Sequence, residues 1–228
     1  MAHLTVSQVL ALPVVRAGGP VVLAGHDHLG GACAGVHSTE MADIAPLLRA
    51  GDLVLTTGIG LPPDQDEIAL RDFVASLSEV ECAGLMVEYG RRWRGALPGV
   101  LVSACEEHGL PLVALTHEVR FAAVIQTVGE LVVDQQLSEL RDAQQVHDTF
   151  TELSFDRAGH AEVLEAVRQL CGASVVLENE HHRPLDFLPG TEDAHFLDGW
   201  PNRSARVSVT GRTGWDETNG WLVTRWHP

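Results

Sequence analysis

The stretch GVHSTEMADIAPLLRAGDLVLTTG, residues 35–58, decides the fold, because two apolar runs flank one amphipathic segment in it. The runs CAGVH (33–37) and DLVLTTG (52–58) are short and nearly continuous in apolar residues, as strands covered on both faces must be. The segment Met41–Arg49 is predicted to be a helix that stops at Gly51. A strand, a helix and a second strand in this order predict a parallel sheet with helices on its faces.

The same alternation continues on both sides of this stretch. Three more apolar runs are predicted strands: VVLAG (21–25), AGLMVEYG (83–90) and PLVAL (111–115). Helices are predicted at Asp66–Glu81, at Pro98–His108 and after a capping box that begins at Thr5. We therefore expect an α/β fold with a mostly parallel sheet and flanking helices.

A long segment without strand character follows the sheet. Residues 119–153 carry an apolar stripe and have neither glycine nor proline after Gly129, which predicts one long helix. Beyond it, the sequence predicts a helix at His160–Cys171, a strand at 174–178, a second apolar run ending at Pro189-Gly190, a short helix around 193–200, and strands near 204–210 and 219–226. We expect three parts: a ligand-sensing domain (1–118), a connector and dimerisation helix (119–157), and a partial α+β unit (158–228).

The composition restricts the function. The formal net charge is −16, and all 15 cationic side chains are arginine. Such an acidic surface repels phosphate backbones, so we expect no direct nucleic-acid binding by this chain. The four cysteines contain no CxxC pair and are typical of reduced core thiols, and no segment resembles a signal peptide or a membrane span. A cytoplasmic protein is expected.

Polar side chains follow four of the predicted strands. In an open parallel sheet, ligands bind at the carboxyl ends of the strands. The clusters combine hydroxyls, glycine amides, carboxylates and guanidinium groups, which suit a small polar ligand. The alternative is that polar residues simply begin loops. The clusters supply these candidate ligand-binding residues: His37, Ser38, Glu40, Thr56, Thr57, Gly58, Glu88, Gly90, Arg91 and Arg92.

Other chemistries have weaker support. The string His26, His28, Cys33 and His37 contains metal-binding residue types, but its spacing matches no standard site, so no metal or other cofactor is expected. The arginines of RRWR (91–94) could contact an anion or a carboxylate partner. Signature motifs of hydrolases, metalloproteases and nucleotide-binding enzymes are missing, so the sequence does not predict an enzyme.

Several motifs together resemble one family. TVSQVLALPVV (5–15), the stretch 35–58, EYGRRW (88–93), ACEEHGLPLVAL (104–115) and EVRFAAVIQTV (118–128) follow the order seen in the purine catabolism regulator (PucR) family. The resemblance adds Asp43 to the candidate ligand-binding residues and also covers Ile44. Two tryptophans common in the family are replaced here, at Gly35 or Val36 and at Leu47.

The resemblance implies a transcription regulator whose front domain senses an effector. It also implies that a GAF-like middle region begins in 158–228 and that a C-terminal helix-turn-helix, absent from this chain, contacts DNA. We expect a small polar metabolite related to purine or nitrogen catabolism as effector, a homodimer, and no membrane contact. The alternative is a scaffold for dimerisation or protein interaction without any small-molecule ligand.

Overall fold

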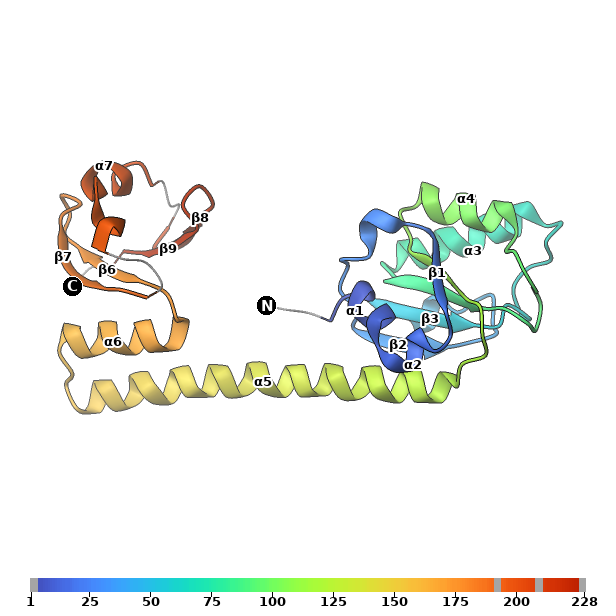
Figure 1. Ribbon diagram of the computed structural model, residues 1–228, viewed down its shortest axis with the longest axis horizontal. Helices are drawn as coiled ribbons and strands as arrows, with labels where there is room; N and C mark the ends of the chain where they lie inside the picture. The colour runs from blue at the N-terminus through green and yellow to red at the C-terminus, as the bar shows by residue number, and fades with distance from the viewer. Residues whose placement is uncertain (1–3, 191–193, 208–210, 226–228) are drawn as a thin grey trace. The chain divides into compact units, whose positions relative to one another are not determined.

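The computed structural model describes residues 4–190, 194–207 and 211–225. It divides into two compact units between Leu140 and Arg141 (Figure 1). Each unit is described by itself.

The N-terminal unit is built on one five-stranded sheet in the order β1-β5-β4-β3-β2. Its strands are β1 (Pro20–Ala24), β2 (Gly35–Ser38), β3 (Asp52–Thr56), β4 (Gly84–Glu88) and β5 (Leu112–Leu115). Strands β2 to β5 are mutually parallel, and β1 pairs with β5 in the antiparallel sense. The predicted mostly parallel α/β sheet is confirmed.

The central strands are apolar throughout because both of their faces are covered. Every residue of β3 and β4 is buried. Successive side chains alternate between faces, so Leu53, Leu55 and Met86 pack in one core cluster, whereas Val54 and Leu85 pack in the other.

Helices cover both faces of this sheet. Helices α3 (Glu67–Glu79) and α4 (Gly99–Glu107) lie on one face, and α1 (Val6–Ala11), α2 (Pro13–Arg16) and the first turns of α5 (Phe121–Phe155) lie on the other (Figure 1). The helices expected at Asp66–Glu81 and Pro98–His108 are confirmed.

The start of α1 confirms the predicted capping box. The Thr5 hydroxyl accepts a hydrogen bond from the Gln8 amide at 3.2 Å, and the Gln8 side chain accepts one from the Thr5 amide at 2.8 Å. Two backbone donors that a helix N-terminus leaves unpaired are thereby satisfied.

Two local predictions are wrong. Met41–Arg49 forms only a short 3₁₀ helix, Ala45–Leu47, because Pro46 lacks the backbone donor that a longer helix beginning at Met41 would need at this position. A strand was expected near 204–210, but α7 (Trp200–Ser204) reaches into this range, and residues 208–210 lie outside the described residues.

The C-terminal unit has mixed helices and small antiparallel sheets, as the predicted α+β pattern requires. After α5 come α6 (His160–Cys171), β6 (Val175–Glu178), β7 (Pro184–Leu188), a 3₁₀ helix (Ala194–Leu197), α7, β8 (Thr213–Asp216) and β9 (Trp221–Thr224). Strand β6 pairs with β7, and β8 pairs with β9.

Stacked aromatic rings hold this unit together. Trp200 and Trp221 stack at a centroid distance of 4.9 Å, and Phe196 contacts both rings. The Arg203 guanidinium lies over the Phe196 ring at 5.2 Å, so a cation–π contact completes the cluster.

The single long helix predicted after the sheet is confirmed as α5, which has 35 residues. Among the described residues, no helix combines the length and the apolar content that crossing a membrane requires.

Candidate functional site

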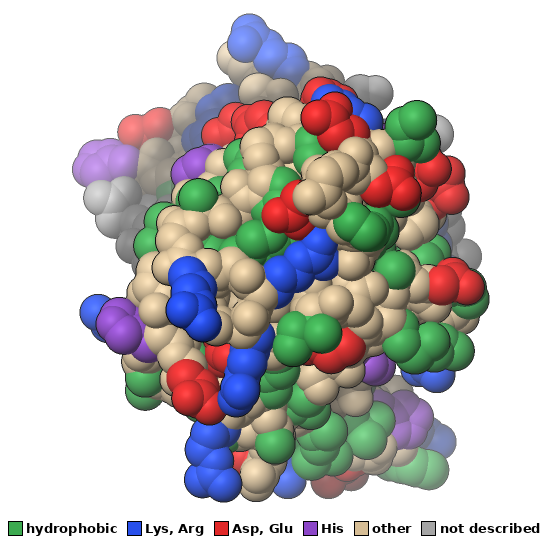
Figure 2. Space-filling view, turned by 90° about the vertical axis from the view of Figure 1, so that its right-hand side faces the viewer, with side chains coloured by type: hydrophobic (Ala, Val, Ile, Leu, Met, Phe, Trp, Pro, Cys, Tyr) green, Lys and Arg blue, Asp and Glu red, His purple; other side chains and the backbone are tan. Residues whose placement is uncertain are grey.

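The carboxyl ends of β2 to β5 lie at one edge of the sheet, because the four strands are parallel neighbours. The loops after β3 and β4 extend to the right of the N-terminal unit in Figure 1. The space-filling view of that side shows arginine and acidic side chains interspersed with hydrophobic ones (Figure 2). This edge therefore offers both donors and acceptors rather than one sign of charge.

Glu40, just after β2, organises the loop that follows β3. Its carboxylate accepts hydrogen bonds from the Thr56 hydroxyl at 3.2 Å, the Thr57 amide at 2.9 Å and the Ile59 amide at 3.1 Å. A carboxylate surrounded by backbone donors is a strong structural anchor. Glu40 joins the β2 and β3 exits, and three of its acceptor sites are used within the chain.

Glycine is required where this loop turns. Gly58 has φ +79°, and a Cβ atom there would lie 2.2 Å from the Trp93 ring. A Cβ atom on Gly60 would overlap the Glu40 carbonyl oxygen, at 1.4 Å. The loop after β3 is therefore packed closely against the segments that follow β2 and β4.

Arg92 joins the β3 and β4 exits. Its Nη1 donates to the Gly58 and Leu61 carbonyls at 2.7 and 2.6 Å, and its Nη2 donates to the Pro62 carbonyl and to Asp64 at 2.6 and 2.7 Å. The guanidinium also lies 4.4 Å from the centroid of the Trp93 ring. These contacts satisfy both terminal nitrogens, so Arg92 braces the loop.

Glu88, the last residue of β4, connects the sheet to the approach of α5. It is 4% exposed, and its Oε2 accepts a hydrogen bond from the Val119 amide at 2.8 Å. Val119 lies two residues before the first residue of α5. The Glu88 carboxylate thus belongs to the candidate site and also binds the segment that leads into α5.

Thr57 differs from its neighbours, because its hydroxyl is unused. The Oγ1 atom is buried and has no hydrogen-bond partner in the described part of the chain. Buried polar atoms are almost always paired, so such an atom needs an explanation.

The remaining candidates lie at the surface of this edge. Arg91 is exposed and lies 3.7 Å from the Glu118 carboxylate, which links the β4 and β5 exits loosely. Gly90 has φ +111°, and its amide donates to the Trp93 carbonyl at 2.7 Å. Ser38 and Asp43 are exposed.

His37 points away from this set. Its Nε2 lies 3.1 Å from the Oδ2 of Asp52, which is the first residue of β3 and lies at the opposite end of that strand. Sequence reasoning missed this pairing, because Asp52 precedes an apolar run instead of following one.

The histidines and the cysteine considered for metal binding do not converge. No group of three His, Cys, Asp or Glu side chains within the described residues is placed to hold a metal ion. The Cys33 thiol is buried and donates to the Gly35 carbonyl, and burial raises the pKa of this thiol to about 11. A thiol that keeps its proton is a poor metal ligand.

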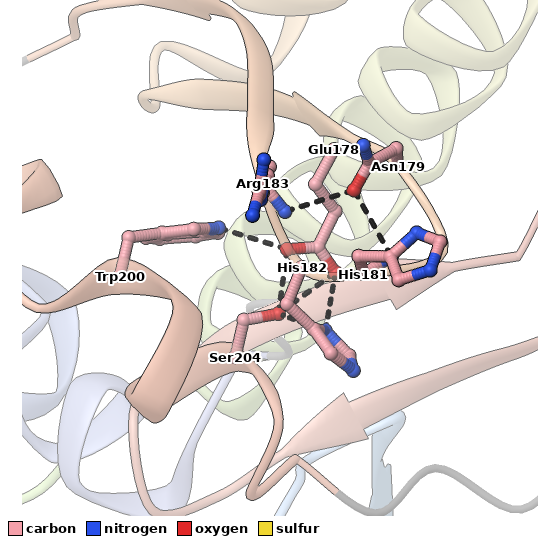
Figure 3. A network of polar contacts seen from close by, with 7 residues as sticks. All are labelled: Glu178, Asn179, His181, His182, Arg183, Trp200 and Ser204. Carbon is pink, nitrogen blue, oxygen red and sulfur yellow. Dashed lines mark hydrogen bonds and ion pairs between the residues drawn. The ribbon is translucent and has the colours of Figure 1, made fainter.

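A second polar cluster, in the C-terminal unit, was missed at the sequence level (Figure 3). The Glu178 carboxylate accepts hydrogen bonds from the Ser204 hydroxyl at 2.6 and 2.7 Å and from the Trp200 indole at 2.8 Å. His182 Nδ1 lies 3.0 Å from the Ser204 oxygen and 3.1 Å from Glu178 Oε1. The polar turn ENEHHR (178–183) was the available signal, but its partners lie more than twenty residues away along the chain.

This cluster has the residue types of a catalytic triad without its geometry. In a Ser-His-acid triad the two imidazole nitrogens contact different partners, and the histidine takes the proton of the serine. Here the same nitrogen faces both Ser204 and Glu178, and the serine donates directly to the carboxylate. The arrangement fastens the β6–β7 turn to α7.

Comparison with known proteins identifies the class of protein that has this fold. The model of the PucR family, described as purine catabolism regulatory protein-like, matches residues 8–132, more than half of the 228-residue chain. The chain belongs to this family, and the resemblance inferred from the sequence motifs is confirmed.

One relative is the purine catabolism regulatory protein of Bacillus subtilis (strain 168). It is 21% identical over 150 residues, which are 66% of this chain and 28% of that protein. The match thus spans less than a third of the relative.

Among solved structures, one match is the regulatory region, with CBS and DRTGG domains, of a Clostridium perfringens pyrophosphatase complexed with diadenosine tetraphosphate. It is 12% identical with a TM-score of 0.31 and covers 58% of this chain and 50% of that chain. A likeness this low supports no inference about ligands.

Proposed function

We propose that this chain is the sensory part of a transcription regulator and binds a small polar metabolite at the carboxyl edge of its sheet. One observation carries the proposal: Glu88 ends a central strand at this edge and bonds to Val119, at the approach to α5. A ligand at the edge would therefore act directly on the segment that leads into the long helix.

The role of each part of the chain is inferred from the family and from the net charge. Residues 1–118 would sense the metabolite, 119–157 would connect and dimerise, and 158–228 would begin a GAF-like region. A net charge of −16 disfavours phosphate contacts, so DNA binding is assigned to a C-terminal helix-turn-helix module. A cytoplasmic location fits this role.

The relay requires two states of the segment before α5. A ligand shifts such an equilibrium only by its difference in affinity for the two states. The candidate coupling element is the stretch 116–120, which is mostly exposed and is held to the sheet by the Val119–Glu88 bond.

A thermal-shift screen tests this function. The panel contains purine-breakdown metabolites and related amides, ureides and carboxylates. We expect one compound to raise the unfolding temperature in a saturable way and Thr57→Ala to abolish the effect. The same compound should change hydrogen exchange at residues 119–124. A saturating ligand that leaves this exchange unchanged would contradict the relay.

A scaffold without a ligand is the second candidate, and exposed apolar side chains on α5 favour it. Val133, Leu137 and Leu140 are 52%, 42% and 65% exposed and recur at helical spacing. A folded dimer that responds to no compound in the panel would favour the scaffold over the sensor.

A further inference from the structure

Thr57 and Glu88 lie side by side at the candidate edge. Thr56 and Val87 are register partners in β3 and β4, and each member of the pair is the next residue along its chain. Strand alternation places Glu88 on the face of Met86. The same alternation, continued one residue beyond β3, directs Thr57 to the face of Leu55. Both faces belong to the same core cluster.

Each residue of this pair keeps unused hydrogen-bonding capacity. The Thr57 hydroxyl is buried without a partner in the described residues. Glu88 is 4% exposed, and no hydrogen bond in the described part of the chain reaches its Oε1. A buried polar atom left unpaired destabilises the fold, and a bound partner would remove that penalty.

The neighbouring charged groups are already engaged. Glu40 bonds to the loop after β3, and both terminal nitrogens of Arg92 bond to that loop as well. The unused capacity of Thr57 and Glu88 therefore consists of one buried hydroxyl and one carboxylate oxygen, and a carboxylate accepts hydrogen bonds without donating any.

We propose that Thr57 and Glu88 form a subsite that recognises the N–H donors of an amide- or amino-bearing metabolite. This inference rests on the proposed function and names the chemical class of its ligand. An anionic group has no N–H donor to offer Glu88 and would be repelled by its carboxylate.

The subsite also explains how binding would reach α5. The ligand and the Val119 amide would share one carboxylate, through Oε1 and Oε2 respectively. The stretch 116–120 is mostly exposed and is tied to this carboxylate through Val119, so a ligand bound to Oε1 would act on it directly.

Calorimetric titration of the full chain with matched probes tests the subsite. The probes are nicotinamide with nicotinate, and adenine with hypoxanthine. The variants are Thr57→Val and Glu88→Gln, and Thr213→Val and Glu79→Gln are controls at exposed positions. Thermal unfolding without ligand verifies that each variant folds.

We expect the amide or amino member of at least one pair to bind and its partner to bind at least tenfold more weakly. Each subsite variant should weaken binding at least tenfold, and the controls should stay within twofold. If Glu88→Gln fails to fold, the binding measured with Thr57→Val alone tests the subsite.

Two other results overturn the subsite. Preference for nicotinate or hypoxanthine over its partner, or binding that neither subsite variant changes, would contradict the subsite. A sensor that uses other residues of this edge would still be possible. If no compound from these pairs or from the wider panel binds the folded chain, the proposed function fails together with the subsite.

Discussion

The Glu88 carboxylate accepts the Val119 amide at 2.8 Å, so a buried acid at a strand end holds the approach to the longest helix. This hydrogen bond joins the end of β4 to the approach of α5, although α4 and β5 lie between them along the chain. Its contribution to the free energy of unfolding can be measured without any ligand.

Glu88→Ala should lower the free energy of unfolding by about 1–3 kcal/mol, because it leaves the Val119 amide without its acceptor. Hydrogen exchange at residues 119–124 should accelerate. Glu88→Gln keeps an amide oxygen as acceptor and should retain most of the stability. Equal losses in the two variants, measured by urea unfolding, would show that the carboxylate acts through something other than this bond.

Arg92→Lys should destabilise the fold by about 1.5–3 kcal/mol, because a lysine cannot replace a planar fork that reaches three carbonyls and Asp64. Arg91→Lys is the matched control. The Arg91 side chain is 61% exposed, and its ion pair with Glu118 spans 3.7 Å, so its variant should stay within about 0.5 kcal/mol. Similar losses at both positions in chemical denaturation would contradict the bracing role.

Gly58→Ala should destabilise by at least about 2 kcal/mol. The left-handed backbone alone costs roughly 1–2 kcal/mol for a residue with a Cβ, and the Trp93 ring would also have to shift. Gly95→Ala, in the same region, is the control, because a Cβ atom at Gly95 would have no neighbouring atom within 4 Å. The difference between their melting temperatures tests the packing of Gly58 against Trp93.

Much of the fold could be predicted from the sequence because it depends on local patterns. Apolar runs such as 52–58 require burial on both faces, and the Thr5–Gln8 capping box is contained within four residues. The prediction of a helix at Met41–Arg49 is wrong because it rests on the stop signal at Gly51, whereas Pro46 restricts the backbone inside the segment.

The candidate site was predicted less completely, because its contacts depend on loop paths. The sequence indicates polar groups at four strand exits, and the structure brings these exits to one edge. The sequence does not show that Arg92 turns back onto the loop after β3 or that His37 pairs with Asp52. In the C-terminal unit, Glu178 and Ser204 are 26 residues apart along the chain, and no local pattern links them.

Two buried thiols predict a loss of stability in alkaline solution. Burial raises the pKa of Cys33 to about 11 and that of Cys105 to about 12, whereas the unfolded chain releases these protons near pH 9. The folded state therefore binds more protons in this window, and the free energy of unfolding should fall as the pH rises from 9 to 11. Cys33→Ala should reduce this slope, whereas Cys171→Ser, at an exposed position, should leave it nearly unchanged. Equal slopes in the parent chain and Cys33→Ala would contradict the contribution of this thiol.

The exposed stripe on α5 predicts self-association. Val133, Leu137 and Leu140 follow one another at spacings of four and three residues, as in the seam of a coiled coil, and all three are exposed in the single chain. The seam is short, because Gln144 and His147 occupy the next two positions of this spacing. Light scattering should give a mass of twice 24.6 kDa that decreases on dilution.

Leu137→Glu with Leu140→Glu should give a monomer, because charged side chains facing one another across the seam repel and lose favourable burial. Ile68→Glu is the control, since Ile68 is 75% exposed on α3, away from this stripe. A dimer that persists in the double variant would place the interface elsewhere. A monomeric parent chain at every concentration would remove self-association through α5, and the relay would then need another element to join two copies.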